Sequence, residues 1–335
     1  MRLGVIFAAL LGLALATWLV VSVGFGSILS AVFAVGWAGF ALLCLCGAAL
    51  FALLGSAWFV LVPRHENPRL VNFVWGRAVR ECAGELLPFS QFGGIVIGAR
   101  ALMLRGVSAS LAFSSTIVDV MVEMVAQIVF ALAGLAILLA LKPHAPPNAS
   151  LTRGIAIGVV VAGAAAALFL LLQQRGLAAL AGWIGRYFPK AGAWLESLHS
   201  GLAEIRASPP GLAVCFAVHL TGWLGTALWA WLALHLIGRP IPFVFVFAIE
   251  AILYAIRSAA IIVPGAIGVQ EATYALLGPL FGVAAPTGIA LSLLKRARDV
   301  ALGVPILLAW QFAEGNRAAT GNKDSARLFR RDGPL

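Results

Sequence analysis

Long apolar runs decide what this chain can fold into. Six of them are candidate spans, at about residues 3–23, 36–62, 108–141, 152–173, 210–236 and 284–312. A helix crosses a hydrocarbon core of about 30 Å with about 20 apolar residues, so each run is long enough to span a membrane. Charged residues make up only 11% of the chain, less than half of the share of about 25% in soluble domains. The sequence therefore predicts an all-α polytopic membrane protein with six full spans.

Basic residues are in excess over acidic ones. The chain has 23 Lys and Arg against 13 Asp and Glu, which gives a formal net charge of +10. In a soluble protein such an excess would suggest nucleic acid as a partner. Here most of the basic residues lie in loops and in the C-terminal tail, where they set membrane topology and meet anionic lipid headgroups. We therefore predict anionic phospholipid headgroups as partners, and no nucleic acid.

Two further apolar runs, at residues 73–104 and 241–281, are each interrupted near the middle. Proline and clustered glycines end a helix at such points. Helical backbone that breaks at membrane depth survives only where it packs in protein or lines a wet cavity, because lipid offers no hydrogen-bond partners. We therefore expect function at these two breaks. The residues that form them are Pro88, Gly93 and Gly94 in the first run and Pro264, Gly265 and Gly268 in the second.

The two interrupted runs correspond at an offset of 176 residues. Pro88 falls on Pro264, and the charged pair Asp119 and Glu123 falls on Lys295 and Asp299. Each half also has the order span, span, interrupted segment, span. The sequence thus predicts two related membrane repeats, at residues 1–142 and 151–313, followed by a polar cytoplasmic tail at 314–335.

The second predicted repeat contains a less apolar insert at about residues 176–207. Within it Leu195, Leu198, Leu202 and Ile205 recur at helical spacing. This pattern predicts a helix that lies flat in the headgroup region. A solvated connector is the alternative.

Loop charge favours interrupted segments that turn back over segments that cross. If both segments turn back, almost all basic loop residues fall on one side, which the positive-inside tendency assigns to the cytoplasm. If both cross, the basic residues of 174–209 move outside. We therefore predict two re-entrant helical hairpins that enter from opposite faces, in inverted repeats, with both termini cytoplasmic.

Polar side chains gather around both breaks. Charged side chains inside a membrane cost at least about 2.5 kcal/mol each on insertion scales, so they usually serve a function or pair with a partner. They indicate either a binding and transport site or a structural ion-pair network. The candidate transport residues are Arg80, Glu81 and Gln91 in the first half and Glu250, Arg257, Gln270 and Glu271 in the second.

A second charged set lies in the last span of each half. Asp119 and Glu123 are one helical turn apart in the first half, and Lys295, Arg298 and Asp299 stand at the corresponding place in the second. We expect these charges to pair between the repeats. His219 is expected to form an interhelical hydrogen bond. The four cysteines predict neither a disulfide framework nor a metal site, and no cofactor motif or catalytic residue set is evident.

Three motifs, in order along the chain, resemble the lysylphosphatidylglycerol synthase transmembrane family, which is also called flippase-like. They are RECAGELLPFSQFGG (80–94), LYAIRSAAIIVPGAIGVQE (253–271) and LLKRARDVALGVPILLAW (293–310). Together they look most like the hopanoid-associated, HpnL-type branch. The resemblance covers nearly all of residues 1–315 and implies a bacterial inner-membrane protein that moves lipids. The soluble aminoacyl-transferase domain of the family's long synthases has no counterpart in this sequence, so lipid aminoacylation is not implied.

The sequence thus predicts a flippase-like lipid transporter of the cell inner membrane, with a hopanoid as its lipid, that works through a polar cavity between two inverted repeats. It is not expected to be an enzyme. Two alternatives remain open: an intramembrane lipid-modifying enzyme that uses the same carboxylates as acid and base, or a non-transporting accessory of hopanoid biosynthesis. A homo-oligomer or hopanoid enzymes are further candidate partners.

Overall fold

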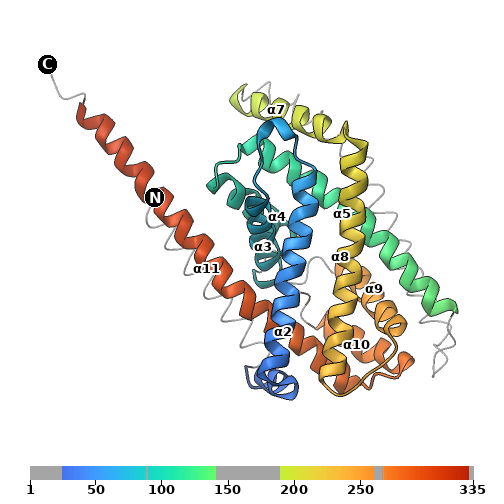
Figure 1. Cartoon of the computed structure of the whole chain (residues 1–335). Coiled ribbons are helices and arrows are strands. Elements are labelled where there is room, and N and C mark those ends of the chain that lie inside the picture. The colour runs from blue at the N-terminus through green and yellow to red at the C-terminus, as the bar shows by residue number, and fades with distance from the viewer. Residues whose placement is uncertain (1–24, 88–89, 141–188, 260–265, 267, 332–335) are drawn as a thin grey trace.

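A computed structural model describes residues 25–87, 90–140, 189–259, 266 and 268–331 (Figure 1). These residues form helices and connecting loops, with no strand among them, as the composition predicts. The predicted spans at 3–23 and 152–173 lie outside the described residues, as do Pro88, Pro264 and Gly265 at the two breaks. The side chain of Gln91 also lies outside the described part.

Nine α-helices account for most of the described chain. In order they are α2 (Phe25–Val60), α3 (Leu70–Leu86), α4 (Ser90–Leu104), α5 (Ala109–Ala140), α7 (Pro189–Arg206), α8 (Pro209–Leu236), α9 (Phe243–Ala259), α10 (Val269–Leu277) and α11 (Ala285–Arg331). Two short 3₁₀ helices, η1 (Arg64–Glu66) and η3 (Gly278–Phe281), lie in connections. Gly36 bends α2 with φ 76°, a left-handed value that favours glycine.

Three of the described helices are long and apolar enough to cross a membrane: Phe33–Val60 within α2, Ala109–Ala140 (α5) and Pro209–Leu236 (α8). They match the runs predicted at 36–62, 108–141 and 210–236. The run at 284–312 falls in α11, where Lys295, Arg296, Arg298 and Asp299 interrupt the apolar sequence. The chain is therefore a membrane protein whose described part is all-helical, while the count of six spans stays a prediction.

The first interrupted run is an antiparallel helical hairpin of α3 and α4. The helices approach closely because glycines face the partner helix: a Cβ added at Gly94 would lie 2.7 Å from the carbonyl oxygen of Arg80, and one at Gly76 would lie 3.0 Å from Cδ2 of Leu102. Both open ends of the hairpin lie near α7, where α2 ends and α5 begins (Figure 1).

The second interrupted run is also a hairpin, formed by α9 and α10. Tyr274 of α10 binds Glu250 in the middle of α9, and Gln270 at the start of α10 binds Arg257 near the end of α9. These two contacts require antiparallel helices. This hairpin opens at the end of the bundle where α8 finishes, opposite α7 (Figure 1). The largest apolar core cluster lies beside it, between α5, α8, α9 and α11.

Helix α7 lies across one end of the bundle (Figure 1). Its apolar stripe is used for packing on the protein: Leu198, Leu202 and Ile205 are buried against residues of α2, α5 and α8, among them Ala57 and Val118. The helix predicted within 176–207 is therefore present from Pro189 to Arg206, and its described apolar side chains contact the bundle instead of facing lipid.

Helix α11 continues through most of the predicted polar tail. It runs to Arg331 and projects beyond the bundle (Figure 1). Near the bundle, Glu314 binds Arg100 of α4 with an Nη2 to Oε1 distance of 2.6 Å. The tail at 314–335 is thus an extension of α11 up to Arg331.

Candidate functional site

A cavity of about 100 Å³ lies in the middle of the bundle, where the two halves meet. Its lining comes from α2, α3 and α5 of the first half and from α8, α9 and α11 of the second. One wall is apolar and aromatic, with Leu50, Phe51, Leu54, Trp223 and Tyr254. The charged lining consists of two guanidinium groups and four carboxylates, namely Arg77, Arg298, Glu81, Glu85, Glu123 and Asp299.

The tips of the two hairpins meet beside this cavity. Glu85 lies one residue before the end of α3, and Arg257 lies two residues before the end of α9. Nη2 of Arg257 donates to both carboxylate oxygens of Glu85 at 2.7 Å, and its Nη1 donates to Gln270 at 3.0 Å. The guanidinium also lies over the ring of Tyr254. The two breaks that the sequence singles out are therefore joined by a direct ion pair.

Two arginines of α3 bind two acids of α5 in the first half. Arg77 and Arg80 each contact both Asp119 and Glu123; the Arg80 Nη1 to Asp119 Oδ2 distance is 2.7 Å. The side chains of Arg77 and Asp119 are 1% and 0% exposed, so neither charge can be satisfied by bulk water. Glu81, which lines the cavity, completes the network through Arg77 at 2.8 Å. A network of this kind offsets the cost of burying each charge alone.

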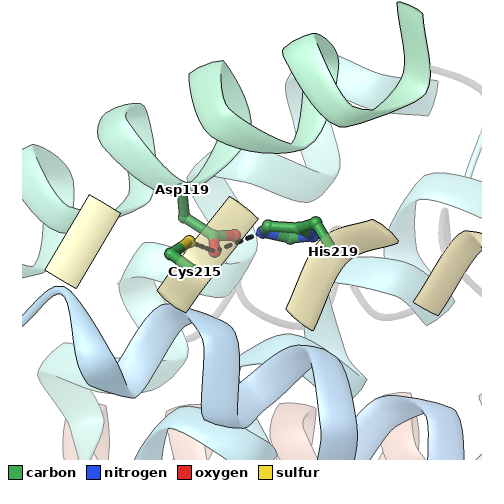
Figure 2. Close-up of side chains that lie close together, drawn as sticks. All are labelled: Asp119, Cys215 and His219. Atoms are coloured by element: carbon green, nitrogen blue, oxygen red, sulfur yellow. Dashed lines mark hydrogen bonds and ion pairs between the residues drawn. The ribbon is translucent and has the colours of Figure 1, made fainter. Parts of the chain in front are cut away.

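Asp119 also joins the halves through α8. Its Oδ1 lies 3.0 Å from Nε2 of His219 and 4.0 Å from Sγ of Cys215 (Figure 2). The potential ligand atoms of these three buried residues lie within 4.8 Å of one another, a spacing that a metal ion can bridge. However, both oxygens of Asp119 and Nε2 of His219 are already hydrogen bonded, and two arginines neutralise the carboxylate. The chemistry of this cluster fits an interhelical hydrogen bond better than a metal centre.

The second half has its own buried ion pair. Glu250 of α9 binds Lys295 of α11 and the hydroxyl of Tyr274 of α10. Glu250 is fully buried and Lys295 is 2% exposed. The Lys295 ammonium also lies 5.3 Å from the ring centroids of Tyr254 and Tyr274, which adds a favourable cation–π contact.

Glu271 stabilises the start of α10. Its Oε2 accepts from the backbone N–H of Gly268 at 2.8 Å, as an acid at the third helical position does in a capping box. Its Oε1 accepts from Nε of Arg296 at 2.9 Å. Gly268 has φ 80°, which suits glycine at the turn into α10. Gln270 bonds to Ser292 of α11 at 2.7 Å, so both residues fix α10 to α11.

Comparison with protein-family models gives one match, to the transmembrane region of lysylphosphatidylglycerol synthase, over residues 5–306. The chain belongs to this family. No curated protein and no solved structure matches it. The matched region includes every residue that lines the cavity. The family relates this membrane protein to membrane lipids in general.

For this member of the lysylphosphatidylglycerol synthase transmembrane family, the structure separates the predicted site residues into two groups. Glu81 lines the cavity, and Arg257 lies next to it through Glu85 and Tyr254. The remaining described candidates do not line the cavity themselves: Arg80 binds the lining residue Glu123, and Glu250, Gln270 and Glu271 bind residues of α9, α10 and α11.

The expected pairing of charges between the repeats is wrong. Asp119 and Glu123 bind Arg77 and Arg80 of their own half, while Lys295 binds Glu250. Arg298 and Asp299 bind each other through the 2.6 Å contact of Nη2 with Oδ1. The reason is proximity: the long side chains of Arg77 and Arg80 reach the acids of α5 from α3, while Lys295 on α11 lies next to Glu250 of α9. The predicted interhelical hydrogen bond of His219 is confirmed.

Glu85 is one of the site residues that the sequence predictions omit, as are Arg77, Trp223 and Tyr254. It stands one helical turn after Glu81 and three residues before Pro88. Its position near the tip of an interrupted segment could have identified it as a site residue.

Proposed function

We propose that this protein moves lipids across the bacterial cytoplasmic membrane and that its headgroup site is the cavity beside Glu85 and Arg257. The supporting observation is the cavity itself, which offers charged side chains on one side and an apolar wall on the other. A lipid needs both surfaces, because its head must keep polar partners while its body stays in apolar surroundings. Following the motifs that resemble the HpnL-type branch, we propose a hopanoid as the lipid.

The proposed path follows the two hairpins. They open at opposite ends of the bundle and their tips meet at the cavity (Figure 1). In a membrane, two re-entrant hairpins of this kind leave only a thin barrier on either side of a central site. Rocking of one half against the other would break the contact between Glu85 and Arg257 and expose the cavity alternately to the two faces.

A repeated ion pair supports inverted repeats. The offset of 176 residues aligns Asp119 with Lys295, and each binds the first helix of the hairpin in its own half. Asp119 binds Arg80 of α3, and Lys295 binds Glu250 of α9. Each half thus has an ion pair between these two helices, with the charges exchanged, although the offset places Glu250 opposite Val74 instead of Arg80.

For topology, we propose that the α7 end faces the cytoplasm. Arg64 in the connection after α2 lies at that end, and Arg239 in the connection after α8 lies at the other; both are exposed. In a background without the four native cysteines, an impermeant maleimide added to spheroplasts should label Arg239→Cys at once and Arg64→Cys only after permeabilisation. The reverse pattern contradicts the assignment.

Transport is tested with the purified full-length protein in proteoliposomes, by following a fluorescent hopanoid between leaflets. Thr226 lines the cavity, whereas Thr221, on the same helix, is exposed; each donates its hydroxyl to the carbonyl four residues earlier. Thr226→Phe fills the cavity and should abolish most transport, while Thr221→Phe should transport like wild type. Equal rates for both variants, at equal thermal stability, would reject the cavity as the path.

Analysis of cellular lipids separates transport from catalysis. Lipid extracts from cells with and without the protein should contain the same chemical species, distributed differently between membranes. A species missing in its absence would instead indicate a lipid-modifying enzyme. An accessory role predicts no transfer by the purified protein alone.

A further inference from the structure

The charges at the cavity do not balance. Among the described residues, the guanidinium groups that line the cavity or bind a lining carboxylate are those of Arg77, Arg80, Arg257 and Arg298. The carboxylates that line it or bind these arginines are those of Glu81, Glu85, Asp119, Glu123 and Asp299. Two further ion pairs of α11 are each balanced, namely Lys295 with Glu250 and Arg296 with Glu271. One carboxylate is therefore in excess.

Glu81 is the acid without a cation of its own. Arg257 binds Glu85, Arg298 binds Asp299, and the other two arginines bind Asp119 and Glu123. The carboxylate of Glu81 lies 2.8 Å from Nη2 of Arg77, which already binds Glu123, and 3.9 Å from Nε of Arg80. Its side chain is 32% exposed, more than that of any of the other four acids. It is thus the carboxylate that exchanges most easily with water in the cavity.

The surroundings of Glu81 do not supply the missing positive charge. Glu85 follows it by one turn on the same face of α3, and like charges at this spacing destabilise each other. The lining from α2 is uncharged, and Arg100 of α4 binds Glu314 outside the lining. The other charged or titratable groups that face the cavity or pair there are Arg77, Arg80 and Cys82 of α3, Asp119 and Glu123 of α5, His219 of α8, Tyr254 and Arg257 of α9, and Arg298 and Asp299 of α11.

A proton on Glu81 neutralises the excess better than two other cations would. A metal ion on this carboxylate would lie next to the guanidinium of Arg77 and be repelled by it. A second proton on the ring of His219 would sit on Nδ1, because Nε2 binds Asp119 (Figure 2). Nδ1 is buried and has no hydrogen-bond partner in the described protein, so a proton there would be an unpaired buried donor.

Entry of a lipid head changes the solvation of Glu81. The cavity has an apolar wall, and a head that enters it displaces the water that solvates the exposed part of this carboxylate. Loss of solvation disfavours the charged form of an acid. The head therefore promotes proton uptake, and by the reciprocity of linked equilibria the proton promotes binding of the head.

We propose that Glu81 takes up a proton as a neutral lipid head enters the cavity and releases it as the head leaves, so that one proton travels with each lipid. The proton comes from water on the side where the lipid enters and returns to water on the other side; only the O–H bond of the acid forms and breaks. This inference rests on the proposed function and adds its energy source.

A pH gradient tests the coupling in proteoliposomes that contain a trace of fluorescent hopanoid. Valinomycin with equal potassium on both sides holds the membrane potential at zero. One proton per lipid transmits the whole gradient, so about one pH unit should shift the leaflet ratio about tenfold toward the alkaline side for wild type. A ratio that ignores the pH gradient, or that follows a sodium gradient instead, would overturn the proposal.

Glu81→Gln isolates the acid. The amide resembles the protonated carboxyl group and cannot ionise, so the leaflet ratio should not respond to the gradient, and the variant should unfold in dodecyl sulfate at no lower concentration than wild type. The control is Glu314→Gln, whose carboxylate pairs with Arg100 outside the cavity lining and whose ratio should shift like that of wild type. A shift for Glu81→Gln equal to that of the control would overturn the proposal.

Infrared difference spectra detect the proton without any transport. The purified full-length protein in a maltoside detergent is compared with and without a hydroxylated hopanoid that, like the detergent, has no carbonyl group. Wild type and Glu314→Gln should gain the carbonyl stretching band of a protonated carboxylic acid when the hopanoid binds, and Glu81→Gln should not. A band that persists in Glu81→Gln, or bound hopanoid without a band in wild type, would overturn the assignment.

The proton site and the transport function fail separately. If wild type gains the band but moves no lipid in proteoliposomes, the proton site on Glu81 stands and the transport function falls. If wild type moves lipid and its leaflet ratio ignores the pH gradient, transport stands and the proton inference falls.

Discussion

Replacing Glu85 by glutamine should destabilise the contact between the two hairpin tips. The side chain keeps its shape and one oxygen acceptor, but it loses its charge. Arg257 is only 12% exposed, and its Nη2 lies 2.7 Å from both oxygens of Glu85. In the variant its remaining described acceptor is Gln270, at 3.0 Å, together with the new amide oxygen.

The magnitude follows from these contacts. Hydrogen bonds to a charged group contribute about 1.5–3 kcal/mol and neutral ones about 0.5–1.5 kcal/mol. Breaking a fully buried ion pair from one side costs about 3–5 kcal/mol. Glu85 is 26% exposed, which lets water screen part of the loss. We therefore expect Glu85→Gln to lower the free energy of unfolding by about 2 kcal/mol.

The assay is reversible unfolding in mixed micelles titrated with sodium dodecyl sulfate, followed by circular dichroism. The matched control is Glu314→Gln, which removes the charge from the ion pair with Arg100 at the edge of the bundle. Arg100 is 39% exposed, so this pair should contribute only about 0–1 kcal/mol. The reasoning is refuted if Glu85→Gln is no more destabilising than Glu314→Gln.

Two further predictions concern packing and burial. Gly94→Ala should destabilise the first hairpin by about 1–3 kcal/mol, because its Cβ would lie 2.7 Å from the backbone oxygen of Arg80; Gly315→Ala, in open space, should not destabilise, and thermal unfolding in detergent distinguishes them. Lys295→Met leaves the Glu250 carboxylate, which is fully buried, without its cation and should cost about 3–5 kcal/mol in the same assay. Adding Glu250→Gln to Lys295→Met should recover most of that loss, and a double variant as unstable as the single one would contradict this account.

The helices and their breaks could be predicted from the sequence because both depend on local chemistry. Apolar runs of span length gave Phe33–Val60 within α2, α5 and α8 to within a few residues, and α3 ends two residues before Pro88, whereas Gly93 and Gly94, predicted as part of that break, lie inside α4. The distribution of basic loop residues predicted that the two hairpins open at opposite ends. Each of these features is set by residues near one another in the chain.

The partners of the buried charges could not be predicted in the same way. Asp119 binds residues 39 to 100 positions away, and its partner depends on which helices pack side by side. Sequence offset aligned Asp119 with Lys295 as equivalent residues of two repeats. Residues that are equivalent in the two predicted repeats need not be adjacent, so the offset was a poor guide to contact.

The most direct measurement of the central claim is the rate of hopanoid transfer between leaflets in proteoliposomes for reversed charges at the hairpin tips. Glu85→Arg alone and Arg257→Glu alone place like charges together and should each lose most of the activity. The double reversal restores an opposite pair and should recover a substantial part of the rate. Wild-type rates in both folded single variants would contradict the claim that lipid passes the site where the two hairpins meet.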